Sequence, residues 1–257
     1  MQLLGALAGD IIGSRFEWNP TKTTDFQLLH EDCSFTDDSV LTVAVANGIL
    51  QGGTFAEEIW DFGNRYPGRG YGNNFMRWLS GSKKEPYNSY GNSSALRVSP
   101  VGWAYDTVED VLENAYQSAV VTHDHPEGIK GAQSVALAVL LARQQKGKEA
   151  IREEIMKRFG YNLTRSLADI RPDYTFDVTC QGSVPEAIIA FLESENFENA
   201  VRNAISLGGD ADTQAAIAGS IAEAYYGPVS GEIASFVKKI VPAEFWDIIK
   251  EFNAQYI

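Results

Sequence analysis

The central helix of this protein is predicted by Leu207-Gly-Gly-Asp210-Ala-Asp212-Thr213-Gln-Ala-Ala-Ile-Ala-Gly-Ser-Ile-Ala-Glu-Ala-Tyr-Tyr226-Gly227. After the first acidic residues, the side chains are small or apolar on nearly every face, and a helix that is apolar all round is buried on all sides. Gly227 and the proline after it end the helix. The sequence therefore predicts a buried central helix with an acidic cluster at its N-terminus.

Two interpretations of Asp210, Asp212 and Thr213 are open, capping and metal binding. A helix cap contributes about 1 kcal/mol and needs only one side chain. Two carboxylates about 4 Å apart repel by about 4 kcal/mol at an effective dielectric near 20. If both aspartates point into a buried site, capping does not offset this repulsion, whereas a bound cation would.

The same pattern occurs a second time, at Thr36-Asp37-Asp38-Ser39, directly before the apolar run 40–50. Capping explains one of these residues, because acids and hydroxyls are common at helix starts. If the two helices pack side by side, however, their starts supply six oxygen ligands to one place. Oxygen ligands of this kind suit Mg²⁺, Mn²⁺ or Ca²⁺ rather than zinc. Four acids exceed what one ion needs, so a two-ion site is predicted.

The N-terminal segment 3–13 has the apolar spacing of a helix. Gly5, Gly9 and Gly13 fall four residues apart and predict a groove in which another backbone packs closely, because each glycine costs a helix about 1 kcal/mol. Asp10 lies within this helix and Glu17 just beyond it. On this evidence alone, either acid could be a surface charge.

Composition excludes several classes of function. The net charge of −13, with a pI near 4.7 and no Lys/Arg cluster, argues against nonspecific nucleic-acid binding. Cys33 and Cys180 are too few and too far apart for a disulfide framework or a zinc site, so the reducing cytoplasm is expected. The apolar run 3–12 is interrupted by Asp10 and too short to span a membrane. A single domain covering residues 1–257 is the simplest organisation.

Two polar loops are candidate ligand-binding segments, 65–72 with alternating glycines and 88–97 with Asn, Ser and Gly. No GxGxxG or Walker motif is complete, so Rossmann and P-loop folds are not predicted. Backbone N–H groups and aromatic rings in these loops would suit a phosphate, a sugar or a base. His123 and His125 lack further metal ligands nearby, so a structural or substrate-contacting role is favoured over zinc binding.

The remaining segments predict further helices and almost no strand alternation, so the fold class is all-α. Asp124 with Glu127 is typical of a capping box at the start of a long helix ending near residue 143. Ser183 with Glu186 predicts a second capping box, at the start of a helix ending near residue 193.

Six motifs together resemble the ADP-ribosylglycohydrolase family: Gly5-Ala-Leu-Ala-Gly-Asp10 running on to Glu17, Phe35-Thr-Asp-Asp-Ser39, Tyr90-Gly-Asn-Ser-Ser-Ala-Leu-Arg97, Thr122-His123, Gln181-Gly-Ser-Val-Pro-Glu186 and Gly208-Gly-Asp-Ala-Asp-Thr213. The resemblance covers residues 3 to 227 in the family's order. It implies a single-domain orthogonal bundle of helices with two divalent cations, Mg²⁺ or Mn²⁺, and a substrate that is an ADP-ribosylated protein or small molecule.

The resemblance also implies roles for individual residues. One ion would be held by Thr36, Asp37, Asp38 and Asp212, and the other by Asp210, Asp212 and Thr213. Glu17 matches a glutamate on a mobile loop that closes over the second ion. Substrate contacts would come from Tyr71, Gly72, Ser89, Tyr90, Gly91, Asn92 and His123, with Tyr90 near the adenine. Ser93 departs from the glycine of many relatives, and Tyr87 is the one candidate for an aromatic residue that some relatives have before this loop.

The resemblance implies hydrolysis of the glycosidic bond between ADP-ribose and an acceptor. In the expected mechanism, Asp37 or Glu17 deprotonates a water molecule, which attacks the anomeric carbon. Arginine, serine, guanidine, a base and an O-acetyl group are all compatible acceptors. Two alternatives remain, a metal-dependent phosphohydrolase acting on a nucleoside diphosphate compound and a non-catalytic ADP-ribose-binding protein.

Overall fold

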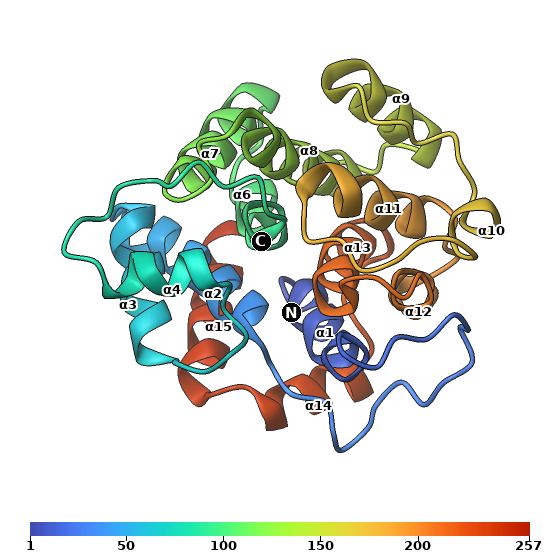
Figure 1. The fold of residues 1–257 in the computed structure, drawn as a ribbon, viewed down its shortest axis with the longest axis horizontal. Coiled ribbons are helices and arrows are strands. Elements are labelled where there is room, and N and C mark those ends of the chain that lie inside the picture. Colours follow the sequence, from blue (N-terminus) through green and yellow to red (C-terminus); the bar gives the residue numbers. More distant parts are fainter.

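The computed structural model describes residues 1–257 as helices joined by loops, with no β-strand (Figure 1). The expected all-α class is therefore confirmed. The elements are α1 Gly5–Gly13, the 3-10 helix η1 Ser14–Phe16, α2 Asp37–Gln51, α3 Phe55–Arg65, α4 Asn73–Ser80, α5 Ser93–Leu96, α6 Ser99–Ala104, α7 Val108–Val120, α8 Pro126–Arg143, α9 Lys148–Phe159, α10 Leu167–Ile170, α11 Cys180–Leu192, α12 Phe197–Ile205, α13 Ala211–Tyr226, α14 Gly231–Ile240 and α15 Ala243–Tyr256.

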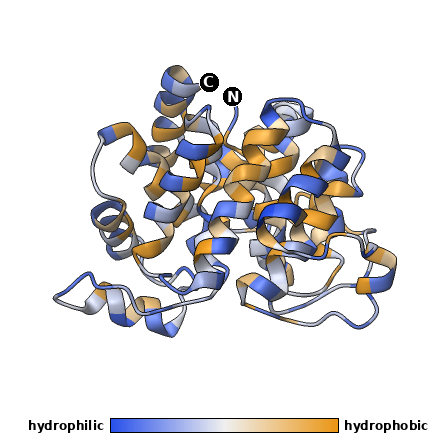
Figure 2. Cartoon of the chain, turned by 90° about the horizontal axis from the view of Figure 1, so that it is seen from above, coloured by the Kyte–Doolittle hydropathy of each residue, from blue (hydrophilic) through white to orange (hydrophobic).

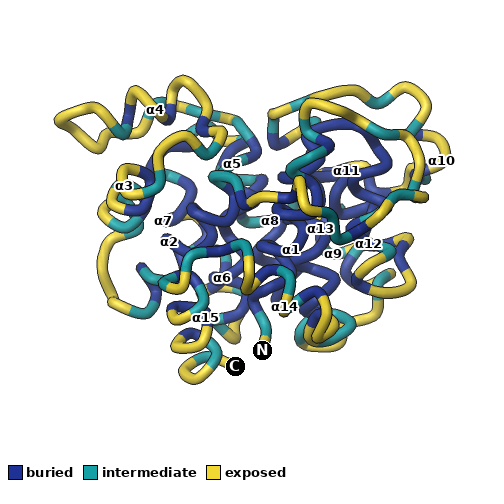
Figure 3. The backbone as a smooth tube through the Cα atoms, turned by 90° about the horizontal axis from the view of Figure 1, so that it is seen from below, coloured by how far each residue is buried: buried dark blue, intermediate teal, exposed yellow.

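Helix α13 occupies the centre of the molecule, as the sequence predicted. Every residue from Ala211 to Ala224 is buried. The helix is surrounded by α1, α8, α11 and α12, which pack against it from different directions (Figures 1 and 3). Hydrophobic residues are concentrated in the helices of the interior in the hydropathy view (Figure 2), and one continuous hydrophobic core includes residues from Leu3 to Phe252. No helix is both long and apolar enough to cross a bilayer.

Helix α1 packs against α13 with its glycine row facing the partner backbone. A Cβ atom added at Gly5, Gly9 or Gly13 would lie 2.4, 2.1 or 2.5 Å from a carbonyl oxygen of α13. Contacts this short do not occur for real side chains, so the two backbones approach only because these positions lack a Cβ atom. The groove that the glycine spacing predicted is therefore present. It fixes where Asp10 and Glu17 stand relative to the start of α13.

We expect Gly9→Ala to be strongly destabilising, because the new methyl group would meet the carbonyl oxygen of Ala215 at 2.1 Å. Overpacking of a close contact typically costs about 1–3 kcal/mol and occasionally more, and a methyl group against a backbone carbonyl belongs at the upper end of this range. Gly231→Ala is the matched control, since nothing lies within 4 Å of its Cβ position in α14. Its expected effect is a gain of less than about 1 kcal/mol. Urea unfolding measures both values, and equal stabilities would contradict the close packing.

A buried glutamate fastens the other end of this helix pair. Glu223 of α13 is fully buried, and its carboxylate accepts hydrogen bonds from the backbone N–H groups of Gly5 at 2.8 Å and Leu4 at 3.3 Å. These N–H groups belong to the first turn of α1, where a helix leaves its donors unpaired. Burial raises the pKa of Glu223 to about 7, because desolvation disfavours the ionised form.

The predicted start of α8 is wrong in one respect. The N-cap is His125, whose imidazole accepts from the N–H of Glu127 at 3.1 Å. Asp124 instead accepts from the N–H of Asn88 at 2.6 Å. The acid therefore holds the polar loop before α5 in place and does not form a capping box. The proline at position 126 occupies the first helical position, where its missing N–H costs nothing.

The predicted capping box at the start of α11 is also wrong. The helix begins at Cys180, and its N-cap is Thr179, whose hydroxyl accepts from the N–H of Gly182 at 3.1 Å. Ser183 lies inside the first turn and donates to the Thr179 carbonyl. Pro185 is therefore inside the helix, where it removes one backbone hydrogen bond. Thr179 is also a favourable cap residue, but serine ranks above threonine at this position, so the sequence pattern alone favoured Ser183.

Candidate functional site

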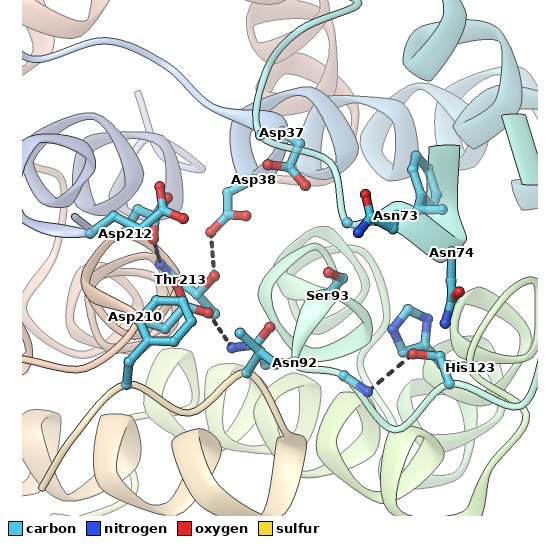
Figure 4. A pocket seen from close by; sticks show the side chains of 18 of the residues that line it. Asp37, Asp38, Asn73, Asn74, Asn92, Ser93, His123, Asp210, Asp212 and Thr213 are labelled. Atoms are coloured by element: carbon cyan, nitrogen blue, oxygen red, sulfur yellow. Dashed lines mark hydrogen bonds between the residues drawn. The ribbon is translucent and has the colours of Figure 1, made fainter. Parts of the chain in front are cut away.

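The starts of α2 and α13 open onto one cavity of about 490 Å³. Acidic side chains gather at one end of it, and Asn73, Asn74 and His123 lie toward the other end (Figure 4). The cavity is lined by Glu17, Asp37, Asp38, Gly70, Gly72, Asn73, Asn74, Phe75, Arg77, Tyr87, Ser89, Gly91, Asn92, Ser93, His123, Phe176, Val178, Asp210, Asp212 and Thr213. Of the predicted site residues, only Thr36, Tyr71 and Tyr90 are absent from this lining.

The two acidic helix starts meet directly. The Thr213 hydroxyl donates to Oδ2 of Asp38 at 2.9 Å, between residues 175 positions apart in the sequence. Carboxylate oxygens of Asp38 and Asp212 lie within 4.8 Å of each other in a group that also contains Asp10. A second group within the same distance contains Glu17, Asp210 and Asp212. Asp212 is therefore common to both groups.

Asp10 is a member of this cluster to which the sequence analysis assigned no role in the site. It is fully buried, so a surface charge is excluded. Its carboxylate accepts from the Thr36 hydroxyl at 2.7 Å, from the Thr36 N–H at 3.1 Å, from the Ser39 N–H at 3.0 Å and from the Ser39 hydroxyl. Four hydrogen bonds occupy most of the lone pairs of a carboxylate. Asp10 therefore positions the start of α2 against α1.

Capping explains one acidic motif but not the other. At α2, the Thr36 side chain is the N-cap and accepts from the N–H of Asp38 at 3.2 Å. At α13, Asp210 occupies the N-cap position but makes no capping hydrogen bond. Its carboxylate instead accepts from Nδ2 of Asn92 at 2.7 Å. Asp210 is thereby directed into the cavity and tied to the polar loop 88–92.

All of these carboxyl groups resist ionisation together. Burial is the largest cause, and mutual repulsion adds to it at most of them. The pKa is raised to about 6 at Asp10 and Asp210 and to about 7 at Glu17. It is raised well above the usual range at Asp37, Asp38 and Asp212. An all-oxygen cluster that is costly to ionise in isolation fits hard divalent cations, whose charge would offset the repulsion.

The glycine-containing loop 65–72 closes over the acidic end. The Asp37 N–H donates to the Arg69 carbonyl at 2.8 Å. Gly70 has φ +103°, and a Cβ atom there would lie 3.0 Å from Oδ1 of Asp37. The loop backbone therefore lies against the carboxylate. The Tyr71 side chain is not part of the cavity lining, because its hydroxyl donates to the Tyr66 carbonyl at 3.0 Å and its ring is buried.

The polar loop 88–92 is pinned against the segment before α11. The Asn92 N–H donates to the Val178 carbonyl at 2.8 Å, and the Cys180 N–H donates to the Tyr90 carbonyl at 2.9 Å. The Tyr90 ring is 47% exposed and packs against His125, with 5.2 Å between the ring centroids. Tyr87 is the aromatic residue of this loop that faces the cavity, with its ring centroid 6.2 Å from that of His123.

A family model described as ADP-ribosylglycohydrolase matches residues 2–231. The chain belongs to the ADP-ribosylglycohydrolase family. The protein named ADP-ribosylhydrolase ARH3 from Xenopus tropicalis is 29% identical over 302 residues, which cover 88% of this chain and 86% of that protein. The human protein of the same name is 27% identical, with 88% and 84% covered. The resemblance inferred from the motifs is therefore confirmed.

A solved structure described as an ADP-ribosylglycohydrolase-related protein complex has the same fold. Its TM-score against this chain is 0.78 at 23% sequence identity, and the superposition covers 99% of this chain and 96% of that one. This similarity confirms the bundle of helices expected for the ADP-ribosylglycohydrolase family.

Several residues of the cavity carried no sequence signal. Asn73 and Arg77 project from α4, and Phe176 and Val178 come from the irregular segment before α11. Phe176 stacks on Trp18, the residue after Glu17, with 5.6 Å between ring centroids. The partners of these side chains lie too far away in the sequence to be paired by inspection.

Proposed function

We propose that this protein is a divalent-cation-dependent hydrolase that cleaves the glycosidic bond between ADP-ribose and an acceptor and releases ADP-ribose. The observation that carries the proposal is the shared position of Asp212, which joins two groups of carboxylates at one end of a 490 Å³ cavity. The names of the ARH3 relatives support the same activity. We assign it to one domain, residues 1–257, because a single hydrophobic core connects both ends of the chain.

The acidic end would hold the cations. We assign Thr36, Asp37, Asp38 and Asp212 to one ion and Asp210, Asp212 and Thr213 to the other, with Mg²⁺ or Mn²⁺ as the ions that suit oxygen ligands. When bound, such ions would supply positive charge and a template for the hydroxyls of the distal ribose. Asp10 would act indirectly, by holding the Thr36 hydroxyl at 2.7 Å.

Glu17 and Asp37 are the residues to which we assign proton transfer. Both line the cavity beside the other carboxylates. A pKa near 7 allows Glu17 to exchange a proton close to neutral pH, which is the condition for efficient general base catalysis. Either carboxylate would take a proton from the attacking water. The surrounding negative charges would stabilise the positive charge that develops at the anomeric carbon during glycoside hydrolysis.

The remaining part of the cavity would hold the ADP moiety. Its volume lies within the range of about 300–1,000 Å³ typical of small-molecule sites. Ser89, Gly91 and His123 supply hydrogen-bonding groups there, and Tyr87 supplies an aromatic face for a base. At the loop 65–72, the backbone around Gly72 faces the cavity, and we assign the contact with the diphosphate to it.

The test is a panel of ADP-ribosylated substrates assayed with Mg²⁺, with Mn²⁺ and with a chelator. The panel carries the linkages to arginine, serine, guanidine, a base and an O-acetyl group, so that it also identifies the acceptor. We expect free ADP-ribose as the product by mass spectrometry, and only with a divalent cation present. AMP as the product would indicate a phosphohydrolase instead. Binding of ADP-ribose with no product from any linkage would indicate a non-catalytic protein.

A further inference from the structure

Arg97 is a buried cation without a carboxylate partner. Its side chain is fully buried, and Nη2 donates to the Ser118 carbonyl at 2.7 Å and to the Thr122 hydroxyl at 3.1 Å. Its Nε and Nη1 atoms have no hydrogen-bond partner. Burying an unpaired charge is costly, and here desolvation lowers the pKa of Arg97 to about 10.

The second contact of Arg97 leads to the cavity. Thr122 is fully buried, and its Oγ1 lies 2.7 Å from Nδ1 of His123. Arginine is only a donor, so the Thr122 oxygen accepts from Arg97. The hydroxyl has a single hydrogen, and Nδ1 of His123 is the acceptor within hydrogen-bond distance of it. Because a buried hydroxyl hydrogen without an acceptor is costly, we infer that it is directed to Nδ1. Nδ1 is consequently an acceptor, and the ring proton of the neutral imidazole is on Nε2.

The protonated nitrogen faces the cavity. His123 is 2% exposed and belongs to the cavity lining. A Cβ atom on Gly91 would lie 3.5 Å from Nε2, so the absence of a side chain at Gly91 leaves this nitrogen accessible. The Cys180 thiol holds the Gly91 carbonyl at 3.0 Å and fixes the loop in that position. Burial and the nearby Arg97 charge lower the pKa of His123 well below its usual range, which agrees with a neutral ring.

We propose that Arg97 is a positioning residue that acts through Thr122 and holds His123 as an Nε2–H donor aimed at an anionic oxygen of the bound nucleoside diphosphate. We infer that the ligand group beside His123 is anionic, because the positive charge of Arg97 has no carboxylate partner and favours a negative group nearby. This end of the cavity lies opposite the acidic end. The nature of the ligand rests on the proposed function. The tautomer of His123 does not, since it is inferred from the contacts among Arg97, Thr122 and His123.

The first test measures the tautomer in the wild-type protein without ligand. Two-dimensional ¹H–¹⁵N correlation through the imidazole carbons distinguishes protonated from unprotonated ring nitrogens. We expect Nδ1 of His123 to be unprotonated and Nε2 to carry the proton at neutral pH. The opposite tautomer, or a doubly protonated ring, would overturn the proposal. The other two histidines, His30 and His125, are assigned by substituting each with glutamine.

The second test compares Thr122→Val with Thr122→Ser. Valine keeps the shape of the side chain but cannot relay the hydrogen bond, whereas serine can. We expect Thr122→Val to raise the Kd for ADP-ribose roughly three- to tenfold, the equivalent of one ordinary hydrogen bond, and to shift the Nδ1 resonance. Thr122→Ser is expected to retain both wild-type values. Equal affinity and an unchanged Nδ1 resonance in the valine variant would contradict the relay.

These measurements separate the two proposals. If the wild-type protein does not bind ADP-ribose, the proposed function fails, while the His123 tautomer is still decided by the nitrogen resonances. If Thr122→Val does not fold, the nitrogen resonances of the wild-type protein decide the proposal, because the relay requires an unprotonated Nδ1 and the opposite tautomer excludes it. If ADP-ribose binds and the tautomer is wrong, only the role of Arg97 is overturned.

Discussion

Asp212→Asn is expected to abolish turnover, by roughly 10³-fold or more, and to weaken Mg²⁺ or Mn²⁺ binding on the order of 100-fold or more. Asp212 is the one carboxylate common to both groups, so its loss removes charge from both proposed ion positions at once. The melting temperature measured with and without cation reports binding separately from activity. The cation-induced rise seen in the wild type should disappear in the variant.

Without cations, Asp212→Asn is expected to raise the melting temperature relative to the wild type. The pKa of Asp212 in the folded state is raised, so in the cation-free protein its ionised form opposes folding. A group with a raised folded pKa contributes stability at low pH and loses it as pH rises through that pKa. At pH 8 with chelator, Asp212→Asn should therefore melt at a higher temperature than the wild type.

Glu223→Gln is the matched control for Asp212→Asn. It also neutralises a buried carboxylate of α13, but its hydrogen bonds go to α1 and not to the cavity. We expect turnover and the cation-induced rise in melting temperature to persist in this variant. An Asp212→Asn protein that kept both properties would remove the basis for the cation site.

Glu17→Gln is expected to reduce turnover roughly 10²- to 10⁴-fold, the usual contribution of a general base. Cation binding should persist more fully than in Asp212→Asn, because Glu17 belongs to only one of the two groups. Burial and the charges of Asp212 and Asp10 raise its pKa to about 7 without cations. Bound cations would lower that pKa, since they favour the ionised form.

The pH profile of kcat tests whether ionised Glu17 acts as the base. A base works when ionised, so wild-type activity should rise with pH through a limb at or below pH 7, and the limb should be absent in Glu17→Gln. Glu31→Gln, an exposed residue of the same long loop, is the control and should leave the profile unchanged. A wild-type limb that survives in Glu17→Gln would assign the proton transfer to another group, with Asp37 the next to test by Asp37→Asn.

The sequence predicted the parts of this site that are encoded locally. Thr36 to Asp38 and Asp210 to Thr213 each combine a helix start with more acid than capping requires, and this excess can be read without a structure. The glycine row of α1 is also local, because a four-residue period in a helix places all three glycines on one face. In both cases the positions of the residues along the sequence determine which side chains share a helix start or a helix face.

The parts that it did not predict depend on distant partners. Asp10 resembles a surface charge until Thr36 and Ser39 are known to lie beside it. The absence of Tyr71 from the cavity lining depends on its hydrogen bond to the Tyr66 carbonyl, which the sequence of a glycine-rich loop does not reveal. The predicted start of α11 was wrong because two hydroxyl residues compete as caps, and the contacts of Cys180 with Tyr90 and Gly91, which accompany the earlier cap, join segments far apart in the sequence.

The pairing of α1 with α13 has a consequence for how the protein is made. Helix α1 leaves the ribosome near the beginning of translation. The backbone that packs on its glycine face, and the carboxylate that accepts from the N–H groups of its first turn, belong to residues 211–226 and are synthesised much later. Until then, a nine-residue helix of almost entirely apolar composition has no permanent partner. Nascent chains are therefore expected to depend on chaperones during synthesis, and rapid overexpression at high temperature should favour inclusion bodies.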